Sequence, residues 1–327
     1  MSQNAFILSS FVILGSLYYK GHVYLSLLFS IAVGCLAFLL RENKLGDPYG
    51  TFHVSLNERR KGEQPTTEWL NMGYWKDTQS FPEACEALAL KLHLVADCKP
   101  GGCVLDVGHG SGDSLLLQLS CPIVPRPSKL VGITSLDSHY KRSMERVADF
   151  KTTCEGDIPE IFLFHGDAIY RQHEDAMQRH PLNPQTLGQP YSTILALDCA
   201  YHFRTRLDFL QQCFSCLEPG GTVALADICF RRKPSWLTTK LIKAMGVMPE
   251  ENIVDTETYF QTMKNLGYTD IVLEDITDDV FPGFEQFLRS RGILWRLFAG
   301  IIHLLAHSGA CFVIVKGKKP QQETSPA

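Results

Sequence analysis

The sequence predicts an α/β fold built on a doubly wound, mostly parallel sheet of seven strands. Between residues 103 and 230, apolar runs typical of buried strands alternate with segments of helical periodicity. A glycine-rich turn separates the first strand from the first helix. The chain of 327 residues, 45% hydrophobic and 20% charged, is long enough to bury a large core. Alternation of this kind predicts parallel strands with helices on both faces of the sheet.

The predicted elements follow one another in a simple order. Strands are expected at 103–108, 129–134, 161–168, 192–198 and 220–228, with helices between them at 113–119, 138–150 and 204–217. Two further helices follow at 235–245 and 255–266, the second with Asp255 as N-cap and Gly267 just past its end. A strand at 270–277, a helical insertion over about 283–306 and a strand at 310–317 complete the seven-stranded sheet.

The first 44 residues predict a membrane anchor. Residues 5–19 and 23–40 are almost wholly apolar, and the second run has the ~18 residues that a bilayer span needs. One tilted span, two spans and a hairpin in one leaflet remain open, as does a buried hairpin of a soluble domain. Basic residues follow the apolar runs, so the remainder is expected to face the cytosol, with the endoplasmic reticulum as the expected membrane. A cleaved signal peptide is disfavoured, because no basic residue precedes the first run.

The remaining boundaries follow from composition. Residues 45–66 are polar and turn-rich and predict a linker, the folded domain is expected over 67–318, and residues 319–327 are expected to be disordered.

The net charge of -4, without a dense basic block, argues against a nucleic-acid partner. The eleven cysteines are scattered, which indicates reduced thiols and no metal site. The oligomeric state is left open.

The turn "DVGHGSG" narrows the choice of cofactor. A dinucleotide loop has a glycine or alanine three residues after its second glycine, whereas Asp113 stands there, and the second strand ends without an acid. A phosphate loop needs Gly-Lys-Ser/Thr, which is absent. Glycines at 108, 110 and 112 would let the backbone approach a ligand that carries no phosphate.

The turn resembles the first motif of class I S-adenosylmethionine-dependent methyltransferases, which have a Rossmann-like fold. "FHGDA" at 164–168 and "LEPGG" at 217–221 resemble later motifs of that family, and "NMGYW" at 71–75 resembles a segment of its tocopherol, sterol, sarcosine and cyclopropane-fatty-acid subgroup. The resemblance covers about residues 70–230. It implies S-adenosylmethionine as cofactor, with a binding site formed by Tyr74, Trp75, Asp106, Gly108, Gly110, Gly112, Thr134, Ser135, His139, Asp167, Ala168 and Asp198.

Within that set, the resemblance implies that Asp106 holds the amino-acid end of the cofactor directly or through water. It also implies that Asp167 and Ala168 meet the adenine ring. The strand-two acid that holds the ribose in many members is absent, which leaves this contact to Thr134, Ser135 or His139.

The segment "LDCAYHF" at 197–203 is expected to carry the chemistry. It follows the fourth strand and resembles the Asp-x-x-x-His element of phosphoethanolamine-type methyltransferases. Histidine suits the removal of a proton from a nucleophile at neutral pH, so His202 is the candidate base, against a role in orienting substrate. Asp198 would orient cofactor or base, or cap the next turn. Tyr201, like Tyr74 and Trp75, would either pack in the core or face the sulfonium by cation-π contact.

The insertion at 283–306 is apolar with three interleaved arginines, which favours either a cover for the sheet edge or a substrate lid at the membrane surface. The sequence therefore predicts a membrane-anchored methyltransferase that acts on a lipophilic small molecule. Two alternatives remain open: N-methylation of a polar amine, and a catalytically inactive, membrane-tethered binding module.

Overall fold

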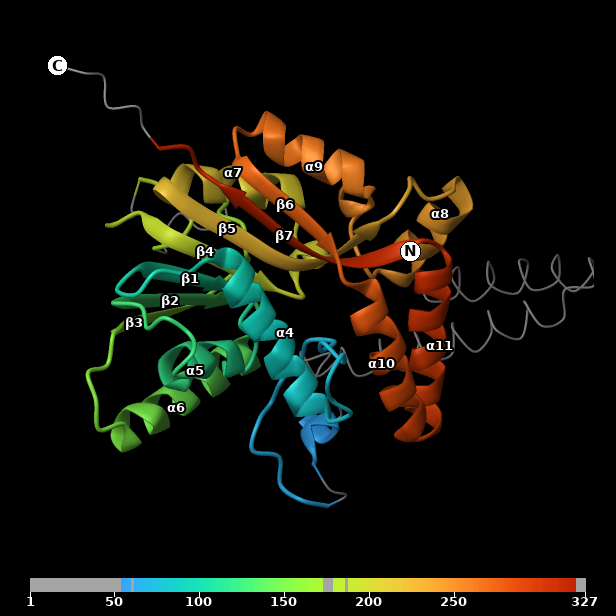
Figure 1. Ribbon diagram of the computed structural model, residues 1–327, viewed down its shortest axis with the longest axis horizontal. Coiled ribbons are helices and arrows are strands. Elements are labelled where there is room, and N and C mark those ends of the chain that lie inside the picture. The colour runs from blue at the N-terminus through green and yellow to red at the C-terminus, as the bar shows by residue number, and fades with distance from the viewer. Residues whose placement is uncertain (1–53, 60–61, 173–178, 186–187, 322–327) are drawn as a thin grey trace, which may run out of the picture.

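The computed structural model describes residues 54–59, 62–172, 179–185 and 188–321. A single seven-stranded sheet forms its centre, in the order β3-β2-β1-β4-β5-β7-β6, and only β7 runs antiparallel to its neighbours (Figure 1). The predicted doubly wound, mostly parallel sheet is thus confirmed. The strands are β1 Cys103–Val107, β2 Lys129–Thr134, β3 Glu160–His165, β4 Tyr191–Leu197, β5 Leu217–Phe230, β6 Thr269–Asp275 and β7 Ala310–Lys318.

Helices cover both faces of the sheet. The described helices are α4 Phe81–Ala96, α5 Asp113–Ser120, α6 Asp137–Thr153, α7 Arg206–Cys216, α8 Trp236–Met245, α9 Thr256–Asn265, α10 Thr277–Ser290 and α11 Ile293–His307. Short 3₁₀ turns lie at η2 Ser55–Asn57, η3 Ala200–His202 and η4 Glu250–Asn252. Apolar side chains of α4, α5, α10 and α11 pack in one core cluster, and those of α7 and α9 pack in a second on the opposite face.

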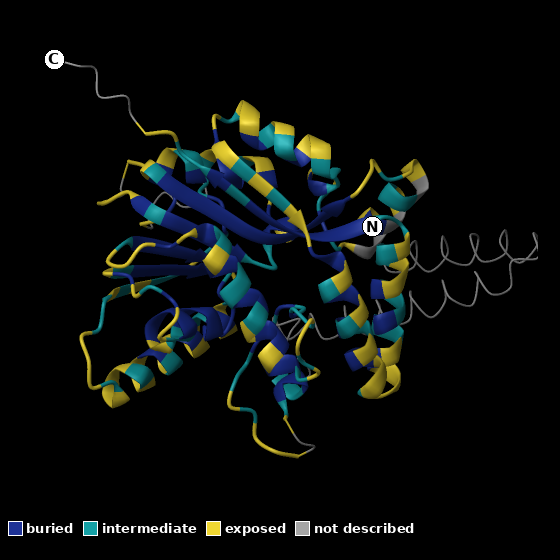
Figure 2. Ribbon diagram, viewed as in Figure 1, coloured by how far each residue is buried: buried dark blue, intermediate teal, exposed yellow. Residues whose placement is uncertain are grey.

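Burial follows the position of each strand in the sheet. All five residues of β1 are buried, whereas the edge strands β3 and β6 are mostly exposed or half-buried (Figure 2). A central parallel strand has helices on both faces, which explains why its sequence is a continuous apolar run broken only by Asp106. The carboxyl ends of β1, β2 and β4 therefore open at one edge, where loops gather.

The C-terminal part differs from the prediction in one respect. Instead of a single insertion over about 283–306, the chain forms two helices, α10 and α11, that stand side by side next to the sheet (Figure 1). The break falls at Gly292, whose φ of 125° is readily adopted only by glycine. Asp255 caps α9 as predicted, by accepting a hydrogen bond from the Thr258 amide.

Both predicted boundaries of the folded domain move outward. Leu56 and Asn57 are buried, and the Asn57 side chain hydrogen-bonds the backbone of Trp69, so part of the predicted linker belongs to the core. At the other end, Lys319 directly follows β7, and its backbone amide donates a hydrogen bond to the Gly221 carbonyl, so Lys319 is attached to the folded domain.

The structure leaves the predicted anchor undescribed. Residues 1–44, predicted to enter a membrane, lie outside the described residues, as does the tail from 322 onward. Within the described ranges, no helix has the length and apolar character to cross a bilayer.

Candidate functional site

A cavity of about 730 Å³ opens at the carboxyl ends of the parallel strands. One end, the cofactor end, is lined by the glycine turn after β1 and by the ends of β2 and β3. The other end, the apolar chamber, is lined mainly by side chains of α10, α11 and the segment 246–248. Asp198 to Arg204, which follow β4, lie between these two ends. Ligands of open α/β sheets bind at this edge of the sheet.

The glycine turn is shaped to hold backbone close to a ligand. Gly108 and Gly110 line the cavity with φ values of 77° and 55°, in the left-handed region. A Cβ atom on Gly108 would stand 2.6 Å from Cys199 Sγ, and one on Gly110 would stand 2.9 Å from Leu70 Cδ1. Side chains at these positions would therefore strain the turn and push apart the walls of the cavity.

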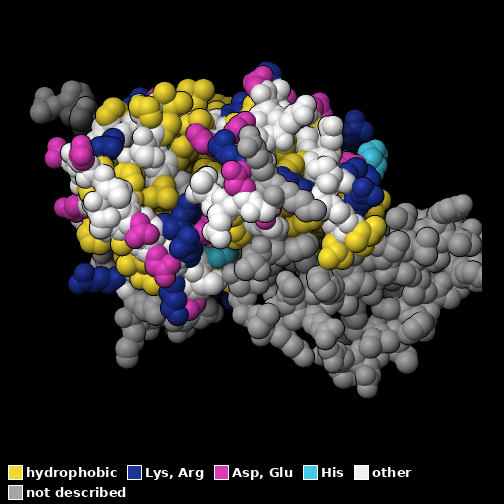
Figure 3. Space-filling view, turned by 90° about the horizontal axis from the view of Figure 1, so that it is seen from below, with side chains coloured by type: hydrophobic (Ala, Val, Ile, Leu, Met, Phe, Trp, Pro, Cys, Tyr) yellow, Lys and Arg dark blue, Asp and Glu magenta, His cyan; other side chains and the backbone are white. Residues whose placement is uncertain are grey.

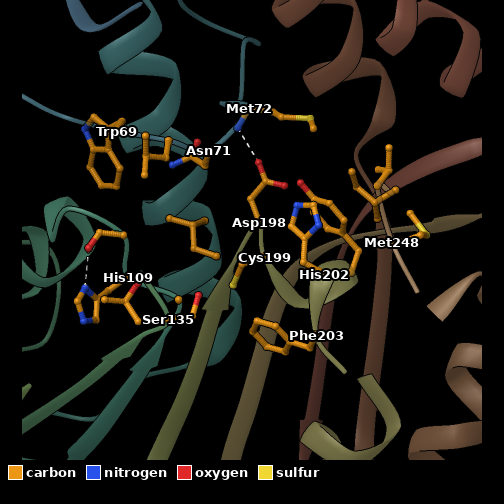
Figure 4. Close-up of a pocket in the computed structure, with 18 of the residues that line it drawn as sticks. Trp69, Asn71, Met72, His109, Ser135, Asp198, Cys199, His202, Phe203 and Met248 are labelled. Carbon is orange, nitrogen blue, oxygen red and sulfur yellow. Dashed lines mark hydrogen bonds between the residues drawn. The ribbon is translucent and has the colours of Figure 1, made fainter. Parts of the chain in front are cut away.

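Residues 68–72, here called the strap, also line the cofactor end. The Met72 amide donates a hydrogen bond of 2.7 Å to Asp198 Oδ2 (Figure 4). The Glu68 amide donates one of 3.0 Å to Asp113 Oδ2. Arg146 in turn binds both carboxylate oxygens of Asp113. The strap is thus tied to the residues after β4 and to the first turn of α5.

The cofactor residues implied for the second and third strands lie at this end. Thr134, Ser135 and His139 line it from β2 and the start of α6, and Asp167 and Ala168 line it after β3. Asp167 Oδ1 accepts a hydrogen bond from the Ile169 amide, which fixes the turn. The ribose and adenine contacts that the resemblance implies for these residues stay predictions.

Asp198 is a half-buried acid with an unusual backbone conformation, and it lines the cavity. Its φ of 56° is unusual for a residue with a side chain, and its Oδ1 atom is buried without a hydrogen-bond partner among the described residues. Burial raises the pKa of Asp198 well above its usual range, although the Met72 amide and the Tyr201 hydroxyl act in the opposite direction. An orphaned carboxylate oxygen here suits a ligand that carries hydrogen-bond donors or positive charge.

His202 lies at the end of the η3 turn, whose shape is closed by its own amide bonding the Cys199 carbonyl at 3.0 Å. Its ring lines the cavity (Figure 4). It stacks at a tilt on Tyr201, with 4.0 Å between ring centroids. The His202 side chain is exposed at the cavity, yet the protein atoms around the ring desolvate it and lower its pKa below 6.5, while the Val247 backbone and Asp227 act in the opposite direction. The imidazole is therefore neutral and able to accept a proton at pH 7.

Four residues expected in the cofactor site do not line the cavity. Asp106 is 1% exposed and lies beneath the glycine turn, where Oδ2 accepts a hydrogen bond from Gln118. Gly112, with φ 96°, instead lets α5 start close to Ser143 of α6. These two residues support the turn from behind.

Tyr74 and Trp75 are the other two, and both pack away from the cavity. Trp75 stacks on Phe287 with 5.2 Å between ring centroids and fits against Gly283 of α10. Burial and the Asp279 carboxyl group raise the pKa of Tyr74 to about 12. Of the two predicted roles for these aromatic residues, packing in the core therefore fits the structure better than a cation-π contact with the sulfonium.

The buried position of Asp106 leads to a prediction for stability. Burial raises the pKa of Asp106 from 3.8 to about 6, so the folded chain holds this proton more tightly than the unfolded chain. The contribution to the free energy of unfolding is then full below pH 4 and is lost as the pH rises to about 6. Asp106→Asn keeps an acceptor for Gln118 and buries no charge, so it should raise that free energy at pH 7.5 by roughly 2–3 kcal/mol.

Urea unfolding at pH 7.5, with the exposed Asp149→Asn as the matched control, measures this change. A loss of stability in Asp106→Asn would instead show that the charged carboxylate is needed for the fold.

Several cavity residues carry no signal in the sequence motifs. His109, inside the glycine turn, is 6% exposed and its Nε2 atom has no hydrogen-bond partner among the described residues. Its ring lies over Gly132, where a Cβ atom would come within 2.8 Å. The first three strap residues, 68–70, precede the recognised "NMGYW" motif at 71–75. The chamber is built by long-range packing that local patterns do not reveal.

The fold and site define a class I S-adenosylmethionine-dependent methyltransferase. The Gly108 and Gly110 positions that no side chain can fill, and the orphaned atoms of Asp198 and His109, fit a cofactor without phosphate. The chain belongs to the methyltransferase domain family, whose model matches residues 74–271. It is an enzyme, and S-adenosyl-L-methionine is its cofactor.

Comparisons with known proteins agree with this family. The chain is 28% identical over 243 residues to erythromycin 3''-O-methyltransferase of Saccharopolyspora erythraea, which covers 69% of this chain and 71% of that protein. Among solved structures, cyclopropane synthase MmaA2 from Mycobacterium tuberculosis superposes with a TM-score of 0.59 at 13% identity, covering 77% of this chain and 90% of the other.

A third comparison is phosphoethanolamine N-methyltransferase 2 of Haemonchus contortus in complex with S-adenosyl-L-methionine, with a TM-score of 0.54 at 15% identity. It covers 72% of this chain and 53% of that chain. At these identities the two structures show a shared fold, and the resemblance of the sequence to these groups is confirmed at the level of the family.

Proposed function

We propose that this enzyme transfers the methyl group of S-adenosylmethionine to a lipophilic small molecule that it takes up next to a membrane. The observation that carries this proposal is the apolar chamber beside the cofactor end. Its wall is formed by aromatic and aliphatic side chains, which are Phe81, Phe281, Phe284, Trp295, Phe298, Ile301, Ile302, Leu305 and Met248. A concave apolar surface with few polar groups suits a neutral, hydrophobic ligand.

Charge supports the same choice of acceptor. Among the described residues that line the cavity, the only basic side chain other than histidine is Arg204, and it lies 3.7 Å from Asp167 at the cofactor end. A phosphorylated amine would need cationic groups to hold its phosphate, because Arg and Lys are the usual partners of that group. The chamber therefore favours a lipophilic acceptor over a phosphorylated polar amine.

The residues between the two ends supply the chemistry. When bound, S-adenosylmethionine provides a methyl group on a positively charged sulfur. His202 accepts the proton of an acceptor hydroxyl or amine during attack, which its lowered pKa allows at neutral pH. The Asp198 carboxyl group holds the strap through the Met72 amide, and its buried Oδ1 atom has no hydrogen-bond partner among the described residues. The apolar walls exclude water, which would otherwise compete for the proton.

The proposed partners are a membrane and a small molecule. The anchor over residues 1–44 and an endoplasmic-reticulum location facing the cytosol remain proposals drawn from the sequence. On the face seen in Figure 3, acidic and basic side chains are intermixed and form no large basic field. This mixture gives no support to a nucleic-acid partner.

Fractionation tests the membrane part of the proposal. The full chain should stay in the membrane pellet after a carbonate wash, and deletion of residues 1–44 should release it, because the apolar runs would then be gone. A glycosylation acceptor placed between residues 45 and 53 should stay unmodified. Release of the full chain by carbonate, or modification of the acceptor, would contradict the anchor or its orientation.

The acceptor is tested by methyl labelling. Cells that lack the enzyme, fed methyl-labelled methionine, should lose labelled products from the organic-soluble fraction, and purified enzyme with labelled S-adenosylmethionine should restore them. Loss confined to water-soluble amines would replace the lipophilic acceptor by a polar one. The absence of any labelled product under both conditions would indicate the alternative, a catalytically inactive binding module.

A further inference from the structure

A buried polar network lies behind the η3 turn that carries His202. Arg206 Nε stands 2.7 Å from Asp227 Oδ2, and their side chains are 4% and 0% exposed. The Tyr259 hydroxyl donates to the same Asp227 oxygen at 2.9 Å, and the Arg206 guanidinium lies over the Tyr259 ring. A buried ion pair is costly to desolvate and gives little net stability, which favours a role in fixing local structure.

Asn252 connects this network to the turn. Its side chain is fully buried, and Nδ2 donates hydrogen bonds to the Tyr201 carbonyl at 3.0 Å and the Phe203 carbonyl at 2.8 Å. Those two carbonyls stand immediately before and after His202. Oδ1 of Asn252 accepts the Arg206 amide at 2.8 Å. Both donors of the amide and its oxygen are therefore used on the backbone that presents His202.

The network also fixes Asn252 itself. The Arg206 guanidinium donates to the Asn252 carbonyl at 3.1 Å and to the Ile228 carbonyl of β5 at 2.7 Å. Val247 and Met248, five and four residues before Asn252, line the cavity, and the Val247 backbone hydrogen-bonds the His202 ring. Residues 247–252 thus hold His202 by its ring and by the two peptide groups around it.

We propose that Asn252 is a positioning residue that sets the direction in which the His202 imidazole faces the acceptor, with the Arg206–Asp227 pair holding Asn252 in register. The proposal rests on the proposed role of His202 as base. Only a side chain with two donors and one acceptor can satisfy both carbonyls and the Arg206 amide. These hydrogen bonds fix the two peptide groups on either side of the proposed base.

The test uses the full chain in detergent. Asn252→Asp places carboxylate oxygen against two carbonyls, and Asn252→Ser keeps a single, shorter donor, so both should release the turn. We expect turnover to fall about 10- to 100-fold, as small misplacements of catalytic groups do, with the affinity for S-adenosylmethionine unchanged. The exposed Asn265→Asp on α9 is the matched control.

A second readout separates this proposal from the role of His202. Titration of isotope-labelled histidines by NMR, assigned with His202→Ala, should show the pKa of His202 moving up toward 6.5 in Asn252→Ser, which adds no charge, as the released ring becomes more hydrated. If His202→Ala alone keeps full turnover, the base is wrong, yet this titration still tests the positioning. An unchanged His202 titration in a folded variant, or failure of both variants to fold, would overturn the proposal.

Discussion

Gly110→Val should abolish measurable binding of S-adenosylmethionine and of its demethylated product. The φ of 55° at Gly110 lies in a region that a β-branched residue adopts only with strain, on the order of 1–3 kcal/mol. The new Cβ atom would also stand 2.9 Å from Leu70 Cδ1 of the strap, so the strap would move away from Asp198. Together these effects should weaken binding by at least about 100-fold, which calorimetry on the full chain measures.

The control for this variant is Gly156→Val. Gly156 is exposed in a bend, its φ is not positive, and an added Cβ atom would make an ordinary contact of 3.6 Å with Arg126. This variant should bind the cofactor normally. Normal binding by Gly110→Val would mean that the ligand does not pass the glycine turn, and the cofactor site would have to be placed elsewhere.

The fold could be predicted from the sequence because short local segments indicate its strands and helices. The central strands are short apolar runs closed by glycine or polar turns, and their alternation with helices dictates a parallel sheet. Helix α4 is absent from the prediction, although Pro82 in its first turn and its apolar periodicity are ordinary helix signals. The break at Gly292 was missed because both helices beside it are apolar and read as one segment.

The site was accessible only in part, for a physical reason. Motif position identifies residues at strand ends, such as Asp167 and Asp198, because the sheet carries those ends to one edge. It does not show which way an aromatic side chain turns. Trp75 turns toward Phe81 and Phe287, so the cavity wall falls two or three residues earlier, at Met72. Leu56 shows the same limit, because its burial depends on partners distant in sequence.

His202→Ala should lower turnover by about 100-fold or more while leaving the affinity for S-adenosylmethionine nearly intact. The imidazole lies at the junction of the cofactor end and the apolar chamber and is neutral at pH 7, so its loss removes a proton acceptor and leaves the glycine turn and strap in place. Single-turnover kinetics should place the loss in the chemical step. The exposed His303→Ala on α11 is the matched control.

The pH dependence provides the second part of this prediction. A base acts in its neutral form, so the rate should rise with pH through the pKa of His202 and level off above it. Because the surrounding protein atoms desolvate the ring and lower that pKa below 6.5, the rise should fall on the acidic side of the ordinary histidine range. The rise should be absent in His202→Ala. A weak dependence in the unmutated enzyme would indicate a carbon acceptor, which loses its proton only after attack.

Near-normal turnover of His202→Ala would exclude histidine catalysis. The rate would then have to come from holding the acceptor against the methyl group in an apolar chamber, since orientation alone can supply a large part of a barrier. In that case substitutions in the wall of the apolar chamber should lower turnover more than substitutions elsewhere in the site. Trp295→Ala, which removes a side chain that is 6% exposed and lines the chamber, would then lower turnover more than His202→Ala, whereas catalysis by His202 requires the reverse order.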